Sequence, residues 1–334
     1  MGDERVITTA GQGLRRVLLD CDPGIDDAVA ILYLAGRHHA GEIELVGIST
    51  TGGNASADQT ALNARWLLDA CGLPEVPVGV GEAGPADREL VTTPETHGPS
   101  GLGHFDARLS DWGAPRLPWR ELWQQCLDED GPVDLIVTGP LTNAAQWDKL
   151  AEFRQVTVMG GAVNYRGNTT PTAEWNFWVD PLAAHRFFRA QLPPVVLCSL
   201  QVTEQFLITP ERAARLAGVL ADADLAASML EMLRFYFEFH DAQGEGYQAQ
   251  VHDAVTAIVA LSACGYDSVP TTMDVEVDSP LLRGTSVADL RGHWGRDANA
   301  SLVRTIDVEG AHAELERGWR LLAQFGPQES KTLR

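Results

Sequence analysis

Short apolar runs alternate with helical stretches along most of the chain. The runs that predict buried β-strands cover residues 17–20, 44–50, 76–80, 134–137, 155–159 and 195–200. The stretches that predict helices lie between them, at residues 28–35, 58–70, 141–150 and 181–190. This alternation predicts an α/β fold with an open, mostly parallel central sheet and helices on both faces. In such sheets, ligands bind at the carboxyl ends of the strands.

Length and composition bound the domain organisation. With 334 residues and 45% hydrophobic content, the chain can bury a large core. Because no composition shift and no fixed-period repeat marks a boundary, we expect a single domain over residues 15–327. Residues 1–14 are polar and without a period, so we expect them to form a flexible arm, and residues 328–334 a tail.

Acidic residues outnumber basic ones by 46 to 25, which gives a formal net charge of -21. A charge of this sign repels the phosphates of nucleic acids and anionic membranes, so neither is an expected partner. No apolar run approaches the roughly 20 residues that a membrane-spanning helix needs. The five cysteines form no CxxC pair and no secretion leader precedes them, so we expect reduced thiols in the cytoplasm.

An acidic run directly after the first predicted strand is the most informative local feature. It reads Asp20-Cys21-Asp22-Pro23-Gly24-Ile25-Asp26-Asp27 and opens into the apolar stretch at residue 28. Four carboxylates this close raise one another's pKa and destabilise the fold unless a cation neutralises them. Oxygen ligands favour a hard ion such as calcium or magnesium over zinc. The alternative is that Asp26 and Asp27 merely complement the dipole of the helix.

Two other templates match part of the acidic run but fail at a second residue. An EF-hand loop requires a glutamate at its twelfth position, where this chain has Ile31 or Tyr33, depending on the aspartate from which the loop is counted. A phosphoaspartyl enzyme requires a lysine beside the transferred phosphoryl group. The two lysines, Lys149 and Lys331, are not well placed for that role.

Two segments resist assignment to helices or strands. Residues 81–103 are rich in glycine and proline, and loops of this length in compact domains are often functional lids. Residues 241–250 carry glycines around Glu245, just before His252 and Asp253. The second segment either closes over a site or is a mobile connection between helices.

Shorter motifs follow the acidic run in a fixed order over most of residues 16–320. They are Gly52-Gly53-Asn54, His97-Gly98, Thr138-Gly139-Pro140-Leu141-Thr142-Asn143, Met159-Gly160-Gly161, Gly167-Asn168, Ala173-Glu174-Trp175-Asn176, Asp180-Pro181 and Val251-His252-Asp253. Each short piece alone is weakly specific, but the whole series is highly specific. In these motifs and their order the chain resembles the nucleoside hydrolases, in particular the inosine-uridine-preferring type.

The resemblance implies an enzyme that hydrolyses the N-glycosidic bond of ribonucleosides to ribose and free base by a calcium-bound water. It implies calcium ligands from the side chains of Asp22, Asp27 and Asp253 and from the backbone carbonyl of Thr138. With water and two ribose hydroxyls, this set suits calcium, which takes roughly six to eight oxygen ligands. Asp22 is also implied as the base that takes a proton from the water. For Asp253 alone, the alternative is an ordinary helix N-cap.

The resemblance also implies a substrate site. Its residues are Asp26, Asn54, His97, Met159, Asn168, Glu174, Trp175 and Asn176. Asp26 would bind a ribose hydroxyl. Asn168 is implied in catalysis as well, although after Gly167 it also fits a turn. We predict a loop-to-strand segment here, in which Glu174 and Asn176 face the same way because residues two apart on a strand share a face.

Departure of a nucleobase is easier when the base is protonated, which points to a histidine. His252 is the main candidate for this catalytic acid, and His97 in the long glycine-rich segment is the second, although a lone histidine is more often structural. Trp175 either stacks on the base or fills the core. His252 favours broad or pyrimidine preference and Trp175 mildly favours purines, so base preference stays open.

Two other functions stay open beside the leading one. A metal-dependent phosphohydrolase would release phosphate from phosphoesters. A non-catalytic, calcium-stabilised nucleoside- or sugar-binding protein would be stabilised by its ligand without turnover. The resemblance further implies a homodimer or homotetramer.

Overall fold

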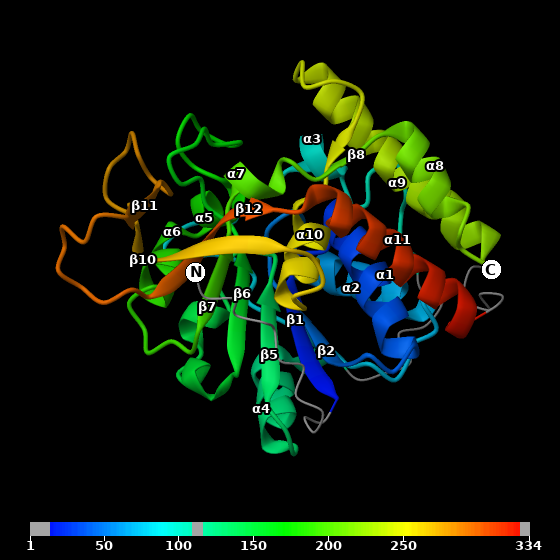
Figure 1. Ribbon diagram of the computed structural model, residues 1–334, viewed down its shortest axis with the longest axis horizontal. Coiled ribbons are helices and arrows are strands. Elements are labelled where there is room, and N and C mark those ends of the chain that lie inside the picture. Colours follow the sequence, from blue (N-terminus) through cyan, green and yellow to red (C-terminus); the bar gives the residue numbers. More distant parts are fainter. Residues whose placement is uncertain (1–13, 109–115, 328–334) are drawn as a thin grey trace, which may run out of the picture.

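A computed structural model describes residues 14–108 and 116–327. Nearly all of the predicted arm, residues 1–13, and the predicted tail lie outside the described residues. Within the described part, the centre of the molecule is a ten-stranded sheet with the order β11-β10-β12-β7-β6-β5-β1-β2-β3-β4 (Figure 1). The strands are β1 (Arg15–Cys21), β2 (Ile43–Thr50), β3 (Val78–Val80), β4 (Leu117–Pro118), β5 (Val133–Val137), β6 (Gln155–Met159), β7 (Val195–Cys198), β10 (Tyr266–Val275), β11 (Ser286–Asp289) and β12 (Ala300–Ile306).

Helices lie on both faces of the sheet (Figure 1). They are α1 (Ile25–His39), α2 (Ala57–Ala70), α3 (Pro94–His97), α4 (Trp119–Asp128), α5 (Trp175–Val179), α6 (Pro181–Phe187), α7 (Leu200–Thr203), α8 (Pro210–Ala217), α9 (Ala223–Ala242), α10 (His252–Ala260) and α11 (Val308–Phe325). A separate antiparallel pair, β8 (Leu207–Ile208) and β9 (Ala249–Gln250), lies beside α9.

All strands from β12 across to β4 are parallel, which confirms the predicted fold class. The remaining edge is different, because β10 pairs antiparallel with both β12 and β11. The sequence analysis did not predict these last three strands. The first half of β10 is partly exposed, so its residues lack the continuous apolar run by which the buried strands are found.

The sheet separates two large hydrophobic clusters. Along β1, Val17 and Leu19 belong to the cluster with α1, α2, α9 and α10, whereas Leu18 belongs to the cluster with α4 and α6. This division follows from the pleat, since successive side chains of a strand point to opposite faces. Burial on both sides explains why the central strands consist mainly of apolar residues, without a regular alternation with polar ones.

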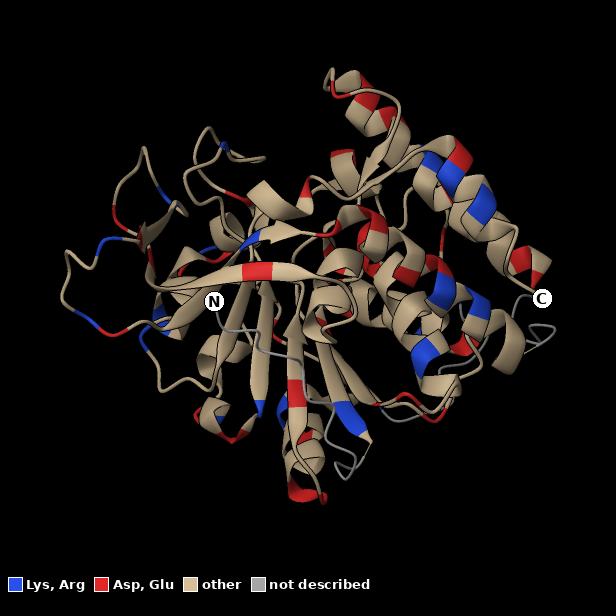
Figure 2. Cartoon of the chain, in the orientation of Figure 1, with Lys and Arg blue, Asp and Glu red and all other residues tan. Residues whose placement is uncertain are grey.

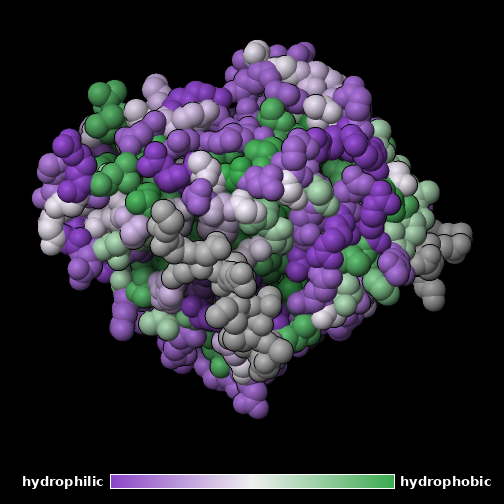
Figure 3. All heavy atoms as spheres, viewed as in Figure 1, coloured by the Kyte–Doolittle hydropathy of each residue, from purple (hydrophilic) through white to green (hydrophobic). Residues whose placement is uncertain are grey.

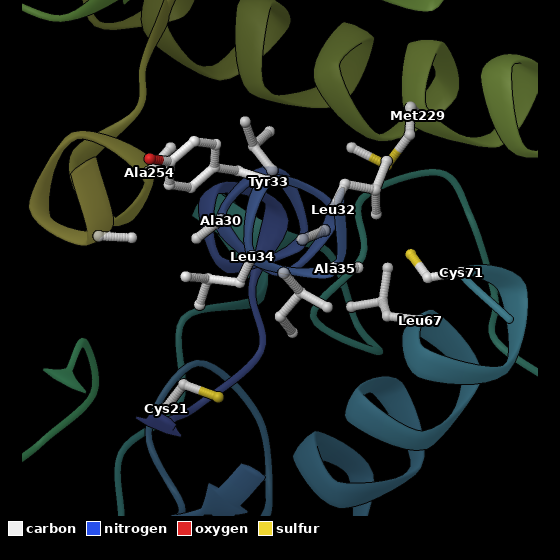
Figure 4. Packing of buried hydrophobic residues seen from close by; sticks show 14 of the residues in the cluster. Cys21, Ala30, Leu32, Tyr33, Leu34, Ala35, Leu67, Cys71, Met229 and Ala254 are labelled. Carbon is white, nitrogen blue, oxygen red and sulfur yellow. The ribbon is translucent and has the colours of Figure 1, made fainter. Parts of the chain in front are cut away.

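Helix α1 is apolar on every side because other elements enclose it. Every residue from 28 to 35 has 0% exposure. Figure 4 shows the side chains around this helix, among them Leu67 from α2, Met229 from α9 and Ala254 from α10. A helix that is hydrophobic all round is stable only in the interior. The enclosure holds the first turn of α1, where the acidic run ends, in a fixed position.

The closest approach on α1 is to helix α11. A Cβ atom at Gly36 would lie only 1.9 Å from the backbone carbonyl oxygen of Gly318. The two helix backbones therefore touch, and only glycine fits at the crossing. Trp319, which is fully buried, fills the space beside the crossing and lies against Val29 of α1.

The helix predicted at residues 141–150 is wrong. The structure has turns there, with short 3₁₀ helices at Ala144–Gln146 and Leu150–Glu152. Side chains of this segment are bonded instead to carboxylates from distant parts of the chain, which holds it in turns. Thr142 Oγ1 donates to Asp180 Oδ2 at 2.9 Å, and Asn143 Nδ2 donates to Asp20 Oδ1 at 2.8 Å. The strand predicted at residues 195–200 ends at Cys198, and α7 begins at Leu200.

Charged residues of both signs are mixed on the outer helices (Figure 2). On α11, for example, Arg317 pairs with Glu314 and Arg320 with Glu316. The face shown in Figure 3 is mainly hydrophilic along its α11 side, with hydrophobic residues in small groups. Within the described ranges, no helix combines the length and the apolar character needed to cross a membrane.

Candidate active site

A cavity of about 450 Å³ opens at the carboxyl ends of the central parallel strands. Three of the four predicted metal ligands line it, namely Asp22, Thr138 and Asp253, and the fourth, Asp27, is fully buried. All eight predicted substrate residues line it as well: Asp26, Asn54, His97, Met159, Asn168, Glu174, Trp175 and Asn176. The structure therefore brings together side chains from more than 200 residues of sequence.

Two helix N-termini carry the acidic centre of the cavity. One carboxylate oxygen each from Asp26, Asp27 and Asp253 lies within 4.8 Å of the others. Asp26 and Asp27 come from the first turn of α1, and Asp253 comes from the first turn of α10. The N-cap of α10 is Val251, with no side-chain cap hydrogen bond, so the alternative of Asp253 as an N-cap is wrong. These carboxylates form a group suited to a metal ion.

Asp22 lies at the edge of this group. Its Oδ2 accepts a 2.7 Å hydrogen bond from the backbone N–H of Asn54, whereas its buried Oδ1 has no hydrogen-bond partner among the described residues. A Cβ atom at Gly53 would lie 2.0 Å from Asp22 Oδ2, so this glycine is required for the close approach. An unpartnered buried carboxylate oxygen is costly unless a cation or a ligand meets it.

Thr138 connects the end of β5 with the acidic centre. Its Oγ1 donates to Asp27 Oδ1 at 2.7 Å. The other oxygen of Asp27 accepts from the backbone N–H of Gly24 at 3.0 Å. The backbone carbonyl of Thr138 accepts from Asn176 Nδ2 at 2.7 Å and keeps a second lone pair for another partner.

The electrostatics of the centre favour a bound cation. Burial, reinforced by the charge of Asp27, raises the pKa of Asp26 to about 7. Burial and the charge of Asp27 likewise raise the pKa of Asp22 well above its usual range. For Asp253, burial and the charge of Asp26 raise the pKa well above its usual range. A divalent cation would offset this repulsion and hold the carboxylates ionised, so the residues present fit a metal.

Glu174 is the N-cap of helix α5 rather than part of a strand, which corrects the predicted loop-to-strand segment. Its carboxylate accepts backbone N–H hydrogen bonds from Gly161 and Asn176, each at 2.8 Å, and from Phe177 at 3.2 Å. Burial raises the pKa of Glu174 to about 7 in spite of these hydrogen bonds. Both Glu174 and Asn176 line the cavity, because the capped first turn of α5 points at it.

Asn168 lies at the mouth of the cavity and is exposed. Its Oδ1 accepts from the backbone N–H of Trp175 at 3.0 Å, which leaves its amide Nδ2 without a protein partner among the described residues. Trp175 stacks on Trp178, with ring centroids 5.7 Å apart. Trp178 therefore supports one face of the Trp175 indole, and Trp175 also lines the cavity.

Each of the two predicted histidines is held through its own Nδ1 atom. His97 Nδ1 accepts from the backbone N–H of Ile25 at 3.1 Å, and His252 Nδ1 lies 2.9 Å from Thr203 Oγ1. Burial lowers the pKa of each to about 3. Both imidazoles are therefore neutral near pH 7, which argues against a proton stored on His252 before substrate binds.

Sequence reasoning missed one wall of the cavity, which consists of Tyr236, Phe239 and His240 from helix α9 together with its C-cap residue Gln243. The spacing of these residues, at i, i+3, i+4 and i+7, places them on one face of a helix and was the available signal. The two unassigned segments also contribute: Glu95 and Thr96 come from residues 81–103, and Glu245 and Gln250 from residues 241–250.

A family model described as inosine-uridine preferring nucleoside hydrolase matches residues 17–313. The chain belongs to this family. The inosine-uridine preferring nucleoside hydrolase of Leishmania major is 35% identical over 307 residues, which are 88% of this chain and 94% of that protein. The pyrimidine-specific ribonucleoside hydrolase RihA of Shewanella sp. (strain MR-7) is 33% identical over 303 residues, 89% of this chain and 93% of that protein.

Solved structures agree with the family assignment. The purine-preferring ribonucleoside hydrolase from Gardnerella vaginalis superposes with a TM-score of 0.82 at 26% identity, covering 93% of this nucleoside hydrolase and 99% of that chain. A plant nucleoside hydrolase, 24% identical, shares the fold with a TM-score of 0.81.

The family establishes the reaction. This nucleoside hydrolase is an N-ribohydrolase that splits ribonucleosides into ribose and free base. Nucleoside hydrolases are metal-dependent, and the acidic centre is where this chain has a group for a metal. Membership sets aside both alternatives, the phosphohydrolase and the non-catalytic binding protein.

Proposed function

We propose that this nucleoside hydrolase holds a calcium ion with Asp22, Asp27, Asp253 and the backbone carbonyl of Thr138. The observation that carries the proposal is the unpartnered buried Oδ1 of Asp22 beside the three-carboxylate group. Carboxylate and carbonyl oxygens in an irregular arrangement suit calcium, whose geometry is more flexible than that of magnesium. When bound, the ion would supply positive charge that orients a water molecule and lowers its pKa.

Asp22 is proposed as the base that receives a proton from the attacking water. The backbone N–H of Asn54 holds Oδ2, which leaves Oδ1 to face the water. Cleavage develops positive charge on the ribose ring, as in other glycoside hydrolyses. Asp26 lines the cavity next to this carboxylate, so its negative charge supports the ring cation while its oxygens accept a ribose hydroxyl.

Asn168, Glu174 and Asn176 are proposed to bind the other sugar hydroxyls. Glu174 keeps its orientation through three backbone N–H groups, which makes it a rigid acceptor. Asn176 is fixed by its amide hydrogen bond to Thr138 O, so its Oδ1 is held at the sugar. A fixed arrangement of this kind orients the ribose toward the water without loss of side-chain entropy on binding.

The base subsite is proposed to lie between Trp175, the two histidines and helix α9. His252 is assigned the contact with the leaving base, with His97 second. The relatives named above are pyrimidine-specific, inosine-uridine preferring and purine-preferring. A cavity of about 450 Å³ falls in the usual range for small-molecule sites, so we propose that both purine and pyrimidine ribonucleosides are accepted.

Three further predictions belong with this proposal. Residues 15–327 act as one domain, the protein works in the cytoplasm, and it assembles as a homodimer or homotetramer. Sedimentation equilibrium measures the assembly, and a monomer at all concentrations would contradict it.

A panel of purine and pyrimidine ribonucleosides tests the proposed function. The purified chain, stripped with a chelator and reloaded with calcium or magnesium, is assayed for free base and reducing sugar. We expect release of ribose with calcium, little with magnesium and none with the chelator. Calcium should also raise Tm, since a ligand that binds only the native state stabilises it by about 2.7 kcal/mol at a hundredfold excess over Kd. Full activity in the chelator would overturn the metal proposal.

A further inference from the structure

Arg166 is an unusual member of the cavity lining. Among the described lining residues, it is the single lysine or arginine, while the acids are Asp22, Asp26, Glu95, Glu174, Glu245 and Asp253. A cation in an otherwise acidic cavity either binds an anionic part of a ligand or is matched by acids of the protein. The contacts of its guanidinium decide between these two roles.

Two glutamates from different segments share the guanidinium of Arg166. Its Nη2 lies 3.1 Å from Glu204 Oε2 and 3.0 Å from Glu245 Oε1. Glu204 is the C-cap of α7, and its side chain is only 5% exposed. The hydroxyl of the neighbouring Tyr165 donates to the same Glu204 oxygen at 2.9 Å. A buried carboxylate requires such partners. The guanidinium of Arg166 is therefore paired with carboxylates of the protein and does not serve to bind an anionic ligand.

Glu245 is itself a fixed anchor. Its Oε2 lies 2.8 Å from His240 Nδ1 and accepts a 3.1 Å hydrogen bond from Gln250 Nε2. His240 lies near the end of α9, and Gln250 pairs in the small β8–β9 sheet. Arg166 therefore ties the segment after β6 to two ordered parts of the opposite wall. We call Arg166, Glu204 and Glu245 the arginine clasp.

Only Gly167 separates the clasp from Asn168. Asn168 is exposed, and its side chain is held only at Oδ1, which accepts hydrogen bonds from the backbone N–H of Trp175 at 3.0 Å and from the hydroxyl of Thr169 at 3.2 Å. Backbone hydrogen bonds from the N–H of Gly167 to Pro171 O at 3.1 Å and from the N–H of Thr169 to Ala173 O at 3.2 Å close the loop that carries Asn168. The clasp anchors this loop on one side, and the first turn of α5 anchors it on the other. Without the clasp, the loop would keep these backbone hydrogen bonds but lose its anchor to the opposite wall, so its placement would have to be fixed when substrate binds, at an entropic cost.

We propose that Arg166 is a positioning residue that holds Asn168 in its substrate-binding place through the arginine clasp. The inference rests on the proposed role of Asn168 in ribose binding.

Arg166→Gln tests the clasp in the calcium-loaded full chain, with a neutral ribonucleoside as substrate. The arginine is half-exposed, so the variant is expected to fold. We expect KM to rise roughly tenfold, the size of losing a charged hydrogen bond, with a smaller change in kcat. Glu245→Gln should act in the same direction, and Arg166→Lys should restore part of the loss. Arg320→Gln, which breaks an exposed pair on α11, is the matched control.

A double-mutant cycle identifies the path of the effect. If Arg166 acts through Asn168, Asn168→Ala should raise KM much less in the Arg166→Gln background than in the wild type. Additive effects, or an unchanged KM in Arg166→Gln, would overturn the proposal. So would a loss confined to 5′-monophosphates, which would mean that the arginine binds an anion.

Hydrogen exchange separates this proposal from the function it rests on. In the calcium-loaded protein without substrate, Arg166→Gln should speed amide exchange at residues 163–172, while Arg320→Gln should not. Exchange that stays at the wild-type rate would contradict the clasp even in an active enzyme. An inactive wild type with clasp-dependent exchange would instead refute the proposed function and leave the clasp intact.

Discussion

Thr138 Oγ1 donates a 2.7 Å hydrogen bond to Asp27 Oδ1, which joins the end of β5 to the first turn of α1. The bond links the two segments that supply two of the proposed calcium ligands, the backbone carbonyl of Thr138 and the side chain of Asp27. It also leaves Asp27 with both carboxylate oxygens partnered, so that its orientation is set before any ion binds. The acidic centre is in this sense preorganised by its neighbours.

Thr138→Val should weaken metal binding while keeping the proposed carbonyl ligand. Loss of a hydrogen bond that orients a ligand typically costs about 10–100-fold in metal affinity. Calcium titration followed by calorimetry measures the change. Thr60→Val is the matched control, because its buried hydroxyl bonds to the carbonyls of Thr51 and Ala57, away from the cavity. Equal calcium affinity in the two variants would contradict the orienting role.

Asp22→Ala should remove a metal ligand and the proposed base together. We expect turnover to fall by several orders of magnitude, with calcium binding also weakened. Asp22→Asn keeps the shape and the hydrogen bond from Asn54 but not the basicity, so it should lose turnover with a smaller loss of calcium affinity. Near-normal turnover in either variant would remove Asp22 from the mechanism.

His252→Ala tests leaving-group activation. If His252 assists the departing base, the variant should be slow on ordinary nucleosides and recover much of its rate on a nitrophenyl riboside, whose leaving group needs no proton. A uniform loss on both substrates, with a lower Tm, would show that His252 is structural. The assignment would then pass to His97 or to Trp175.

Glu174 should make the protein less stable as pH rises. Burial raises its pKa from 4.5 to about 7, so the folded state favours the protonated form. The favourable contribution is complete below pH 4.5 and is lost as pH rises to about 7, amounting to about 3 kcal/mol at 1.36 kcal/mol per unit. Denaturant unfolding in the presence of a chelator measures the free energy of unfolding at each pH. Between pH 4.5 and 7, this free energy should fall more steeply with pH in the wild type than in Glu174→Gln. If the free energies of unfolding of the two proteins changed with pH in parallel, the raised pKa of Glu174 would be contradicted.

Local patterns were sufficient for the central elements. The strands β1, β2, β3, β5, β6 and β7 and the middle of helix α1 are largely buried, so short runs of mainly apolar residues mark them in the sequence. The acidic run after β1 was equally clear, because four carboxylates in eight positions have few structural explanations. Helix α9 was missed although its buried residues recur at helical spacing, because it lacks the continuous apolar run that marks α1 in the sequence.

The sequence by itself determined the fold class, the acidic run after β1 and the family's motifs, because each of these is a pattern of residues close together in the chain. Only the tertiary structure decided which distant groups meet. It changed Glu174 from a strand residue to a helix cap, turned residues 141–150 into turns, and joined Arg166 to Glu204 and Glu245. The reason is physical: periodicity reports which face of an element is buried, whereas the partner of a buried polar group depends on how the elements pack.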